Sequence, residues 1–115
     1  MTSAQASDDS HMAVFRIGRF AVPPAAMPAF MERIQQARAL LAAQPGCLKS
    51  SVLTHTAGAT EFNVVSIVEW ASLQAMEAAK SAIEAQQIQQ GFDPETFRRD
   101  HGIRADTAVY SVAPS

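Results

Sequence analysis

Two strand-like segments in the middle of the chain, joined by a very short link, restrict its fold more than any other feature. The segments 48–56 and 61–70 are rich in β-forming residues, and Ala57-Gly58-Ala59-Thr60 lies between them. A glycine-containing link of this length favours an antiparallel hairpin. Any fold of this chain must therefore contain an antiparallel sheet, with the flanking segments arranged around this hairpin.

The segment before the hairpin predicts one strand and one helix. Residues 14–22 favour a strand that Pro23-Pro24 ends, and Gly18 within it indicates a bulge or a close contact. Over residues 25–43 the apolar side chains recur at steps of three and four residues, which is typical of one helical face. These side chains are Met27, Phe30, Met31, Ile34, Ala37 and Leu41. Gln44-Pro45-Gly46 then ends the helix and turns the chain.

The segment after the hairpin predicts two helices and a last strand. Ser72 can cap a helix that Gly91 closes, and its apolar stripe consists of Leu73, Met76, Ala79 and Ile83. Asp93-Pro94-Glu95 starts a short helix that runs through Arg99 and stops at Gly102. The pattern of side chains over residues 104–113 alternates with a period of two, which predicts a fourth strand.

The order of these elements predicts an α+β fold of the ferredoxin-like, split βαβ kind. Its four-stranded antiparallel sheet carries the two main helices on one face. Because strand side chains alternate, one set points to the helices: Val14, Phe20, Val22, Phe62, Val64, Val68 and Trp70. The other set, Phe15, Ile17, Val65 and Ile67, is equally apolar and has no helix to cover it. A second copy of the chain is the expected cover, so we predict a homodimer.

Length and charge limit the number of domains and the kinds of partner that this protein can have. With 115 residues and 48% hydrophobic content, the chain has room for one domain, which we place at 13–113 after a disordered tail at 1–12. A net charge of −2 gives no field for nucleic acid or anionic lipid. The apolar runs are too short to span a membrane, the start lacks the pattern of a signal peptide, and Cys47 is single. We therefore expect a cytoplasmic protein with neither a nucleic-acid nor a membrane partner.

Several short motifs, in this order and spacing, resemble the antibiotic biosynthesis monooxygenase (ABM) family. They are Val22-Pro23-Pro24 with Phe30, Gln44-Pro45-Gly46-Cys47, Val68-Glu69-Trp70 before Ala71-Ser72-Leu73, Gly91-Phe92-Asp93-Pro94-Glu95 and Gly102-Ile103-Arg104-Ala105-Asp106. The likeness covers about 14–112, and it implies a dimeric α+β barrel. Members of that family include cofactor-free oxygenases that form quinones from polycyclic phenols, and oxygenases that degrade haem.

The resemblance also indicates site residues. Trp70 matches a Trp that the quinone-forming members place at the end of the third strand, whereas Ser66 stands where they have an Asn and Met76 about where they have a Tyr. The haem-degrading members carry an iron-ligating His late in the second helix, but this region reads Glu84-Ala85-Gln86-Gln87. The resemblance therefore implies a catalytic Trp70 with Ser66 and Met76 as substrate contacts, and it argues against haem degradation. The alternative for Trp70 is plain core packing as a large apolar side chain.

Three more residues have chemistry that suits such a site. His55, near the end of the second strand, has a side chain whose ordinary pKa suits a general base for a phenol; otherwise it is a partly exposed strand-end residue. Arg16 lies in an apolar strand, so it needs either an anionic ligand or an ion pair with Asp106 or Glu69. Tyr110 can donate to a ligand oxygen or pack at the dimer face. The histidines and Cys47 form no metal-ligand spacing, and the glycines form no phosphate loop, so we predict no metal and no cofactor.

These residues lead to one main hypothesis and two alternatives. The main hypothesis is a cofactor-independent monooxygenase for an electron-rich phenol or dihydroquinone, in which His55 accepts the proton, Trp70 stacks on the ring, and Ser66 and Arg16 hold oxygens. The first alternative is a non-catalytic dimeric domain that binds a small aromatic or apolar metabolite. The second is an isomerase or lyase on the same fold.

Overall fold

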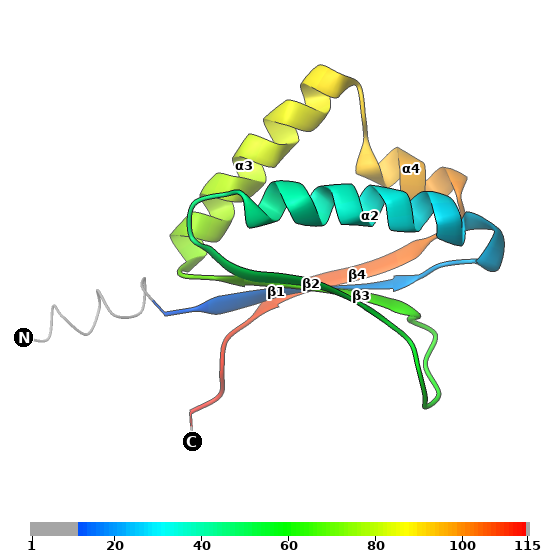
Figure 1. The fold of residues 1–115 in the computed structure, drawn as a ribbon, viewed down its shortest axis with the longest axis horizontal. Coiled ribbons are helices and arrows are strands. Elements are labelled where there is room, and N and C mark those ends of the chain that lie inside the picture. The colour runs from blue at the N-terminus through cyan, green and yellow to red at the C-terminus, as the bar shows by residue number, and fades with distance from the viewer. Residues whose placement is uncertain (1–11, 115) are drawn as a thin grey trace, which may run out of the picture.

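A computed structural model describes residues 12–114, so the predicted tail at 1–12 lies, apart from Met12, outside the described residues. The elements follow the predicted order (Figure 1). The strands are β1 (Val14–Ala21), β2 (Cys47–Thr54), β3 (Val64–Trp70) and β4 (Arg104–Tyr110), and the helices are η1 (Pro24–Ala26), α2 (Met27–Ala42), α3 (Leu73–Gln90) and α4 (Pro94–Asp100). Within the described chain, no helix combines the length and the apolar character that crossing a bilayer requires.

The four strands form one antiparallel sheet in the order β2-β3-β1-β4. Figure 1 shows the helices on one side of this sheet, which confirms the predicted ferredoxin-like α+β architecture. We call this side the helix side and the opposite side the open side. Two segments project from the sheet on the open side, at opposite ends: the β2–β3 connection, 55–63, and the segment 111–114 that follows β4.

The ends of α3 and α4 follow the sequence signals. The Ser72 hydroxyl accepts a hydrogen bond from the Ala75 N–H at 3.1 Å and so satisfies one of the free amides of the first turn of α3. Gly91 ends α3 in the left-handed conformation, at φ 70°. The Asp93 carboxylate accepts from the Glu95 N–H at 3.2 Å, with Pro94 at the first helical position of α4.

The core on the helix side divides into two clusters. One lies between α2 and the end of the sheet next to the β2–β3 connection, and its buried members are Val22, Ala26, Phe30, Ile34, Val64 and Ile103. The other lies under α3 at the opposite end, and its buried members are Val68, Trp70, Met76 and Ala79. Alternation along β3 therefore holds as predicted, since Val64, Val68 and Trp70 are its most buried residues.

Phe62 departs from that alternation, so its predicted place on the helix side is wrong. Phe62 precedes β3, and its ring lies 4.8 Å from the Arg19 guanidinium carbon, near Val65 on the open side. The cause is Asn63, whose side chain accepts from the Val22 N–H and donates to the Val22 carbonyl, both at 2.9 Å. These two bonds take the segment out of the regular strand, and the period of two ends there.

Candidate ligand site on the helix side of the sheet

The sheet register gathers polar side chains on the helix side. Arg16 lies opposite Val68, so Ser66 and Trp70 are its two diagonal neighbours on the adjacent strand. Diagonal neighbours on one face of a sheet are about 7–8 Å apart, within reach of a long side chain. Ser50 lies in the same cross-strand row as Arg16, on the other side of Val68. We call Arg16, Ser50, Ser66 and Trp70 the polar cluster.

Trp70 is the most enclosed member of the cluster. Its side chain is 1% exposed and packs with Met76 and Val68, against which Val14 and Leu41 also lie. The ring is therefore part of the core, whereas its indole N–H is buried and has no acceptor among residues 12–114. A buried N–H without an acceptor costs free energy, so this group is one that a ligand oxygen could satisfy.

Ser50 shares this property and was missed by the sequence reasoning. Its hydroxyl oxygen is buried and has no hydrogen-bond partner among residues 12–114. Strand alternation could have placed Ser50 beside Arg16, but the register of β2 shifts between Cys47 and Lys49, and the sequence gives no sign of that irregularity.

Arg16 is a half-buried cation on a central strand of the sheet. Burial is the main reason that the pKa of its guanidinium lies below the ordinary value; Arg98 on α4 acts in the same direction, and Glu84 and Glu77 act against it. Two ion pairs occur among residues 12–114, Arg19–Asp106 and Arg104–Glu61, and Arg16 belongs to neither.

The ion pair that the sequence suggested for Arg16, with Asp106 or Glu69, is therefore wrong. Asp106 lies opposite Arg19 in the register and bonds to it, and Glu69 lies opposite Phe15. Both carboxylates thus share the face of the odd-numbered residues of β1, while Arg16 points to the other face.

The helix side is incompletely covered next to Arg16. Val109 and Thr107, the β4 residues opposite Arg16 and Gly18, are exposed, and the Val109 side chain is 41% exposed. Gly18 adds no side chain there, and a Cβ at this position would meet the Phe20 ring at 3.1 Å, so its predicted close contact is confirmed. Arg16 therefore borders an exposed surface at the β4 edge of the sheet, whereas the polar atoms of Ser50 and Trp70 lie deeper.

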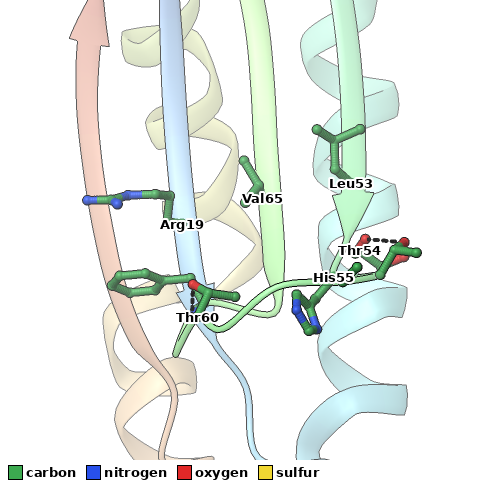
Figure 2. A pocket seen from close by; sticks show the side chains of 9 residues that line it. Arg19, Leu53, Thr54, His55, Thr60 and Val65 are labelled. Carbon is green, nitrogen blue, oxygen red and sulfur yellow. Dashed lines mark hydrogen bonds between the residues drawn. The ribbon is translucent and has the colours of Figure 1, made fainter.

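The structure does not bring His55 and Tyr110 to this cluster. His55 follows the end of β2, and its Nε2 lies 2.5 Å from the Gly58 carbonyl oxygen. It lines a pocket of about 510 Å³ with Arg19, Leu53 and Val65 on the open side (Figure 2). Tyr110 lies opposite Phe15 at the end of β4 and is 50% exposed. Of the six predicted site residues, Arg16, Ser66, Trp70 and Met76 come together.

The remaining ionisable groups add no further centre. Within residues 12–114, no group of three or more His, Cys, Asp or Glu side chains is placed to hold a metal ion. His101 ends α4, with Nδ1 2.8 Å from the Phe97 carbonyl oxygen and its ring stacked on the Phe97 ring at 4.2 Å. His11 lies outside the described residues.

Solved structures share this fold. A candidate monooxygenase from Shewanella loihica PV-4 is 22% identical. The match covers 90% of this chain and 97% of that one, with a TM-score of 0.66. The N63A mutant of SnoaB, a cofactor-independent oxygenase from Streptomyces nogalater, is 22% identical; the match covers 90% of this chain and 95% of that one, with a TM-score of 0.65. The haem degrader MhuD from Mycobacterium tuberculosis, solved with two haems in its active site, is 22% identical. The match covers 89% of this chain and 97% of that one, with a TM-score of 0.62. At these identities the likeness concerns the fold.

The sequence itself matches a family model. No curated protein sequence matches the chain, but the model for antibiotic biosynthesis monooxygenases matches residues 13–91, which include β1, β2, β3, α2 and α3. That range contains every member of the polar cluster as well as Met76. The chain therefore belongs to the antibiotic biosynthesis monooxygenase family.

Proposed function

We propose that this protein is a monooxygenase that binds an electron-rich phenol, such as a dihydroquinone or an anthrone in its enol form, at the polar cluster. The observation that supports this most is Arg16, a half-buried cation outside both ion pairs of the described chain, beside two buried polar groups without partners. A phenolate oxygen beside Arg16 would compensate its charge, and further oxygens of the substrate would serve the two buried groups.

The chemistry requires little from the protein. A cation beside a phenol favours its ionised form, so Arg16 would lower the pKa of the bound hydroxyl and hold the resulting oxyanion. The electron-rich anion can then transfer an electron to dioxygen. For an anthrone, the net change converts one CH₂ carbon into a carbonyl, with one dioxygen consumed and one water released. The apolar surroundings of Val68 and Met76 would exclude bulk water from the reacting carbon.

The roles proposed for Trp70 and His55 differ from those expected from the sequence. The Trp70 ring is enclosed by core residues, so we assign it the wall of the site and a hydrogen bond from its indole N–H rather than stacking on the substrate. His55 lies on the open side, so we assign it no proton transfer.

Haem chemistry does not fit the residues present. In the family members that degrade haem, the resemblance locates the iron ligand late in the second long helix, but α3 carries no imidazole. His55 follows β2 and His101 is already engaged with the Phe97 carbonyl at the end of α4, so neither projects from α3. The proposed reaction therefore does not use haem.

Oxygen uptake tests the proposal. Purified protein is given a panel of dihydroquinones and anthrones in an oxygen electrode, and wild type is compared with Arg16→Gln, Ser66→Ala and boiled protein. Arg16→Gln should lower kcat/KM at least tenfold for any substrate that wild type oxidises, whereas Arg99→Gln, at an exposed site on α4, should leave it unchanged. Equal oxygen uptake by wild type, Arg16→Gln and boiled protein would sink the proposal.

A non-catalytic binding module is the second candidate, because neither histidine of residues 12–114 lies beside the polar cluster. Such a module would bind the same phenols without consuming oxygen. Fluorescence of Trp70, the single tryptophan, would then respond to the phenol while the oxygen trace stays flat.

We further propose that the protein is a homodimer in which the open sides of two sheets pack together. On that side Ile17 lies opposite both Ile67 and Ala108, so the centre of the face is apolar. Charges of both signs flank this centre, with Lys49 beside Glu69 at one end and Arg19 beside Asp106 at the other. A face that carries both signs can pair with a copy of itself.

A further inference from the structure

Helix α3 packs against the core only along its first half. Met76 and Ala79 are its buried residues, whereas Ile88 near its end is 79% exposed. Figure 1 shows the same divergence, with the end of α3 farther from the sheet than its start. Figure 2, which looks at the sheet from the open side, shows α3 behind β1 and β4. Arg16 of β1, which points to the helix side, therefore lies below a helix whose second half the core does not hold.

One flank of α3 carries two carboxylates. Glu77 and Glu84 are seven residues apart, so they lie on the same flank, each one position after a residue of the apolar stripe. Burial lowers the pKa of the Arg16 guanidinium, whereas the charges of Glu84 and, less strongly, of Glu77 act to raise it. Carboxylates of α3 are therefore near the cation to which we assign the phenolate.

Glu84 also lines a cleft of about 420 Å³ between the end of α3 and α4. Phe92 and Pro94 give this cleft an apolar part, and Arg98 lines it from α4. The charges of Glu84 and Arg98 both act on Arg16, so the cleft adjoins the guanidinium at the polar cluster. Glu77 does not line the cleft, which singles out Glu84 as the carboxylate that both features share.

We propose that Glu84 accepts the proton of the phenol that Arg16 binds. In this step the phenolic O–H bond breaks, its electron pair stays on the oxygen beside Arg16, and the proton moves to a carboxylate oxygen of Glu84. The oxidation then proceeds as described under the proposed function, on which this inference rests. Glu84 finally gives the proton to the reduced oxygen, which leaves as water.

This assignment supplies a base to a site that otherwise has none, because neither histidine of residues 12–114 lies beside the polar cluster. In water a carboxylate is a weaker base than a phenolate, so the transfer depends on the cation. Arg16 lowers the pKa of the bound hydroxyl and brings it closer to that of a carboxyl group. The roles of Arg16 and Glu84 are therefore coupled.

Oxygen uptake with the panel of dihydroquinones and anthrones tests the role of Glu84. Glu84→Gln should lower kcat roughly 10² to 10⁴-fold with little change in KM, and Glu84→Asp should recover part of the loss. Glu32→Gln, at an exposed site on α2, is the matched control and should keep the wild-type kcat. Glu84 is itself exposed, so the Tm of its variants should stay close to that of wild type.

The pH dependence of the rate gives a second criterion. The wild-type kcat should fall as the pH is lowered and the Glu84 carboxylate is protonated, whereas Glu84→Gln should lack this fall. Other ionisable groups lie around the cleft or on the same flank of α3, so the comparison with the variant is what assigns the fall. These groups are Arg16 of β1, Arg33 of α2, Glu77 and Lys80 of α3, Asp93 before α4, and Glu95 and Arg98 of α4.

Binding of 4-nitrophenol tests the same transfer without oxygen, because the colour of this probe reports its ionisation. Below the pKa of the free probe, titration calorimetry in buffers of different ionisation enthalpy counts the protons released on binding. Wild type should bind the coloured phenolate and release no proton, because Glu84 retains it. Glu84→Gln cannot take the proton, so it should release one proton for each phenolate that it binds.

The outcomes separate this inference from the function on which it rests. Wild-type kcat in Glu84→Gln, combined with a loss in Arg16→Gln, would leave the proposed function standing and overturn the role of Glu84. A wild type that releases a proton with each bound phenolate, or that binds 4-nitrophenol without colour, would also overturn it. A wild type that neither consumes oxygen nor binds 4-nitrophenol would refute both.

Discussion

Trp70 and His55 lie at opposite ends of the sheet and on opposite sides of it. Trp70 pairs with Val14 and Cys47 and is buried beneath α3, whereas His55 follows Thr54, the partner of Val64 at the far end of β3. The seven residues of β3 separate these ends by about 20 Å. One protomer therefore cannot place both side chains on a single small substrate.

This separation predicts that substitutions at the two sites act independently on stability. Trp70→Phe should lower the free energy of unfolding by about 1–2 kcal/mol, because it reduces the volume of a fully buried side chain. His55→Ala should cost less than about 0.5 kcal/mol at an exposed site. Urea unfolding of the double variant should equal the sum within about 0.5 kcal/mol, and a larger coupling would mean that the residues share contacts.

The separation also predicts the kinetic effect of His55→Ala. If the oxidation takes place at the polar cluster, this variant should keep at least half of the wild-type turnover, and the rate should show no step at the pKa of an imidazole. A general base at His55 would instead give a loss of roughly 10² to 10⁴. A pH–rate profile of wild type and variant distinguishes the two.

Ile67→Glu should dissociate the proposed dimer. The side chain lies opposite Ile17 in the apolar centre of the open side, so a carboxylate there would be buried without a partner. Sedimentation at tens of micromolar should show a monomer for Ile67→Glu and a dimer for wild type and for Ile88→Glu. A monomeric wild type at that concentration would contradict the interface, since obligate apolar interfaces persist there.

Gly46→Ala should destabilise the fold far more than Gly58→Ala. Both glycines have left-handed φ values, 86° and 87°, so an alanine costs about 1–2 kcal/mol of backbone strain at either site. At Gly46 the new Cβ would also lie 2.5 Å from the Ala75 Cβ, whereas at Gly58 nothing lies within 4 Å. Thermal unfolding should give the lower Tm for Gly46→Ala, and equal Tm values would contradict this difference.

Cys47 should react slowly with thiol reagents. Burial raises the pKa of its thiol, which outweighs the opposite effect of the Lys49 carbonyl contact. The native state therefore favours the protonated form, and this contribution to stability is lost as pH rises from the pKa of an unfolded Cys through the folded value. Iodoacetamide should label the native protein more slowly than the urea-unfolded chain, with a rate that still rises above pH 9.

Local sequence signals predicted the elements well because their causes are local. Ser72 and Gly91 bound α3 through hydrogen bonds and φ values set within one turn, and Pro94 fixes the start of α4. The alternation of β3 likewise placed Val64, Val68 and Trp70 on the helix side. The hairpin strands were predicted at 48–56 and 61–70 and were found at 47–54 and 64–70. Their ends differ from the prediction because non-local contacts dominate there.

The site was predicted less completely, because it depends on which strands are neighbours. Arg16 was singled out as a charge within an apolar strand, and it is half-buried, but its proposed partners lie on the other face. The β1–β4 register pairs Asp106 with Arg19 instead. His55 was expected near the end of the second strand and at the site. It does follow β2, but the chain turns towards the open side there, away from the polar cluster. Ser50 became visible only after the irregularity between Cys47 and Lys49 was located.

The Asn63 side chain that holds the Val22 backbone determines how this part of the sheet exchanges amide hydrogens. The Val22 N–H is protected by a side chain rather than by a neighbouring strand, while the Asn63 N–H donates to the Phe20 carbonyl at 3.0 Å. Exchange at Val22 therefore reports local undocking of the β2–β3 connection, which needs no global unfolding. The two amides lie close together in space, but their exchange rates report different motions. The rate at Val22 reports the movement of the connection, and the rate at Asn63 reports the opening of the sheet.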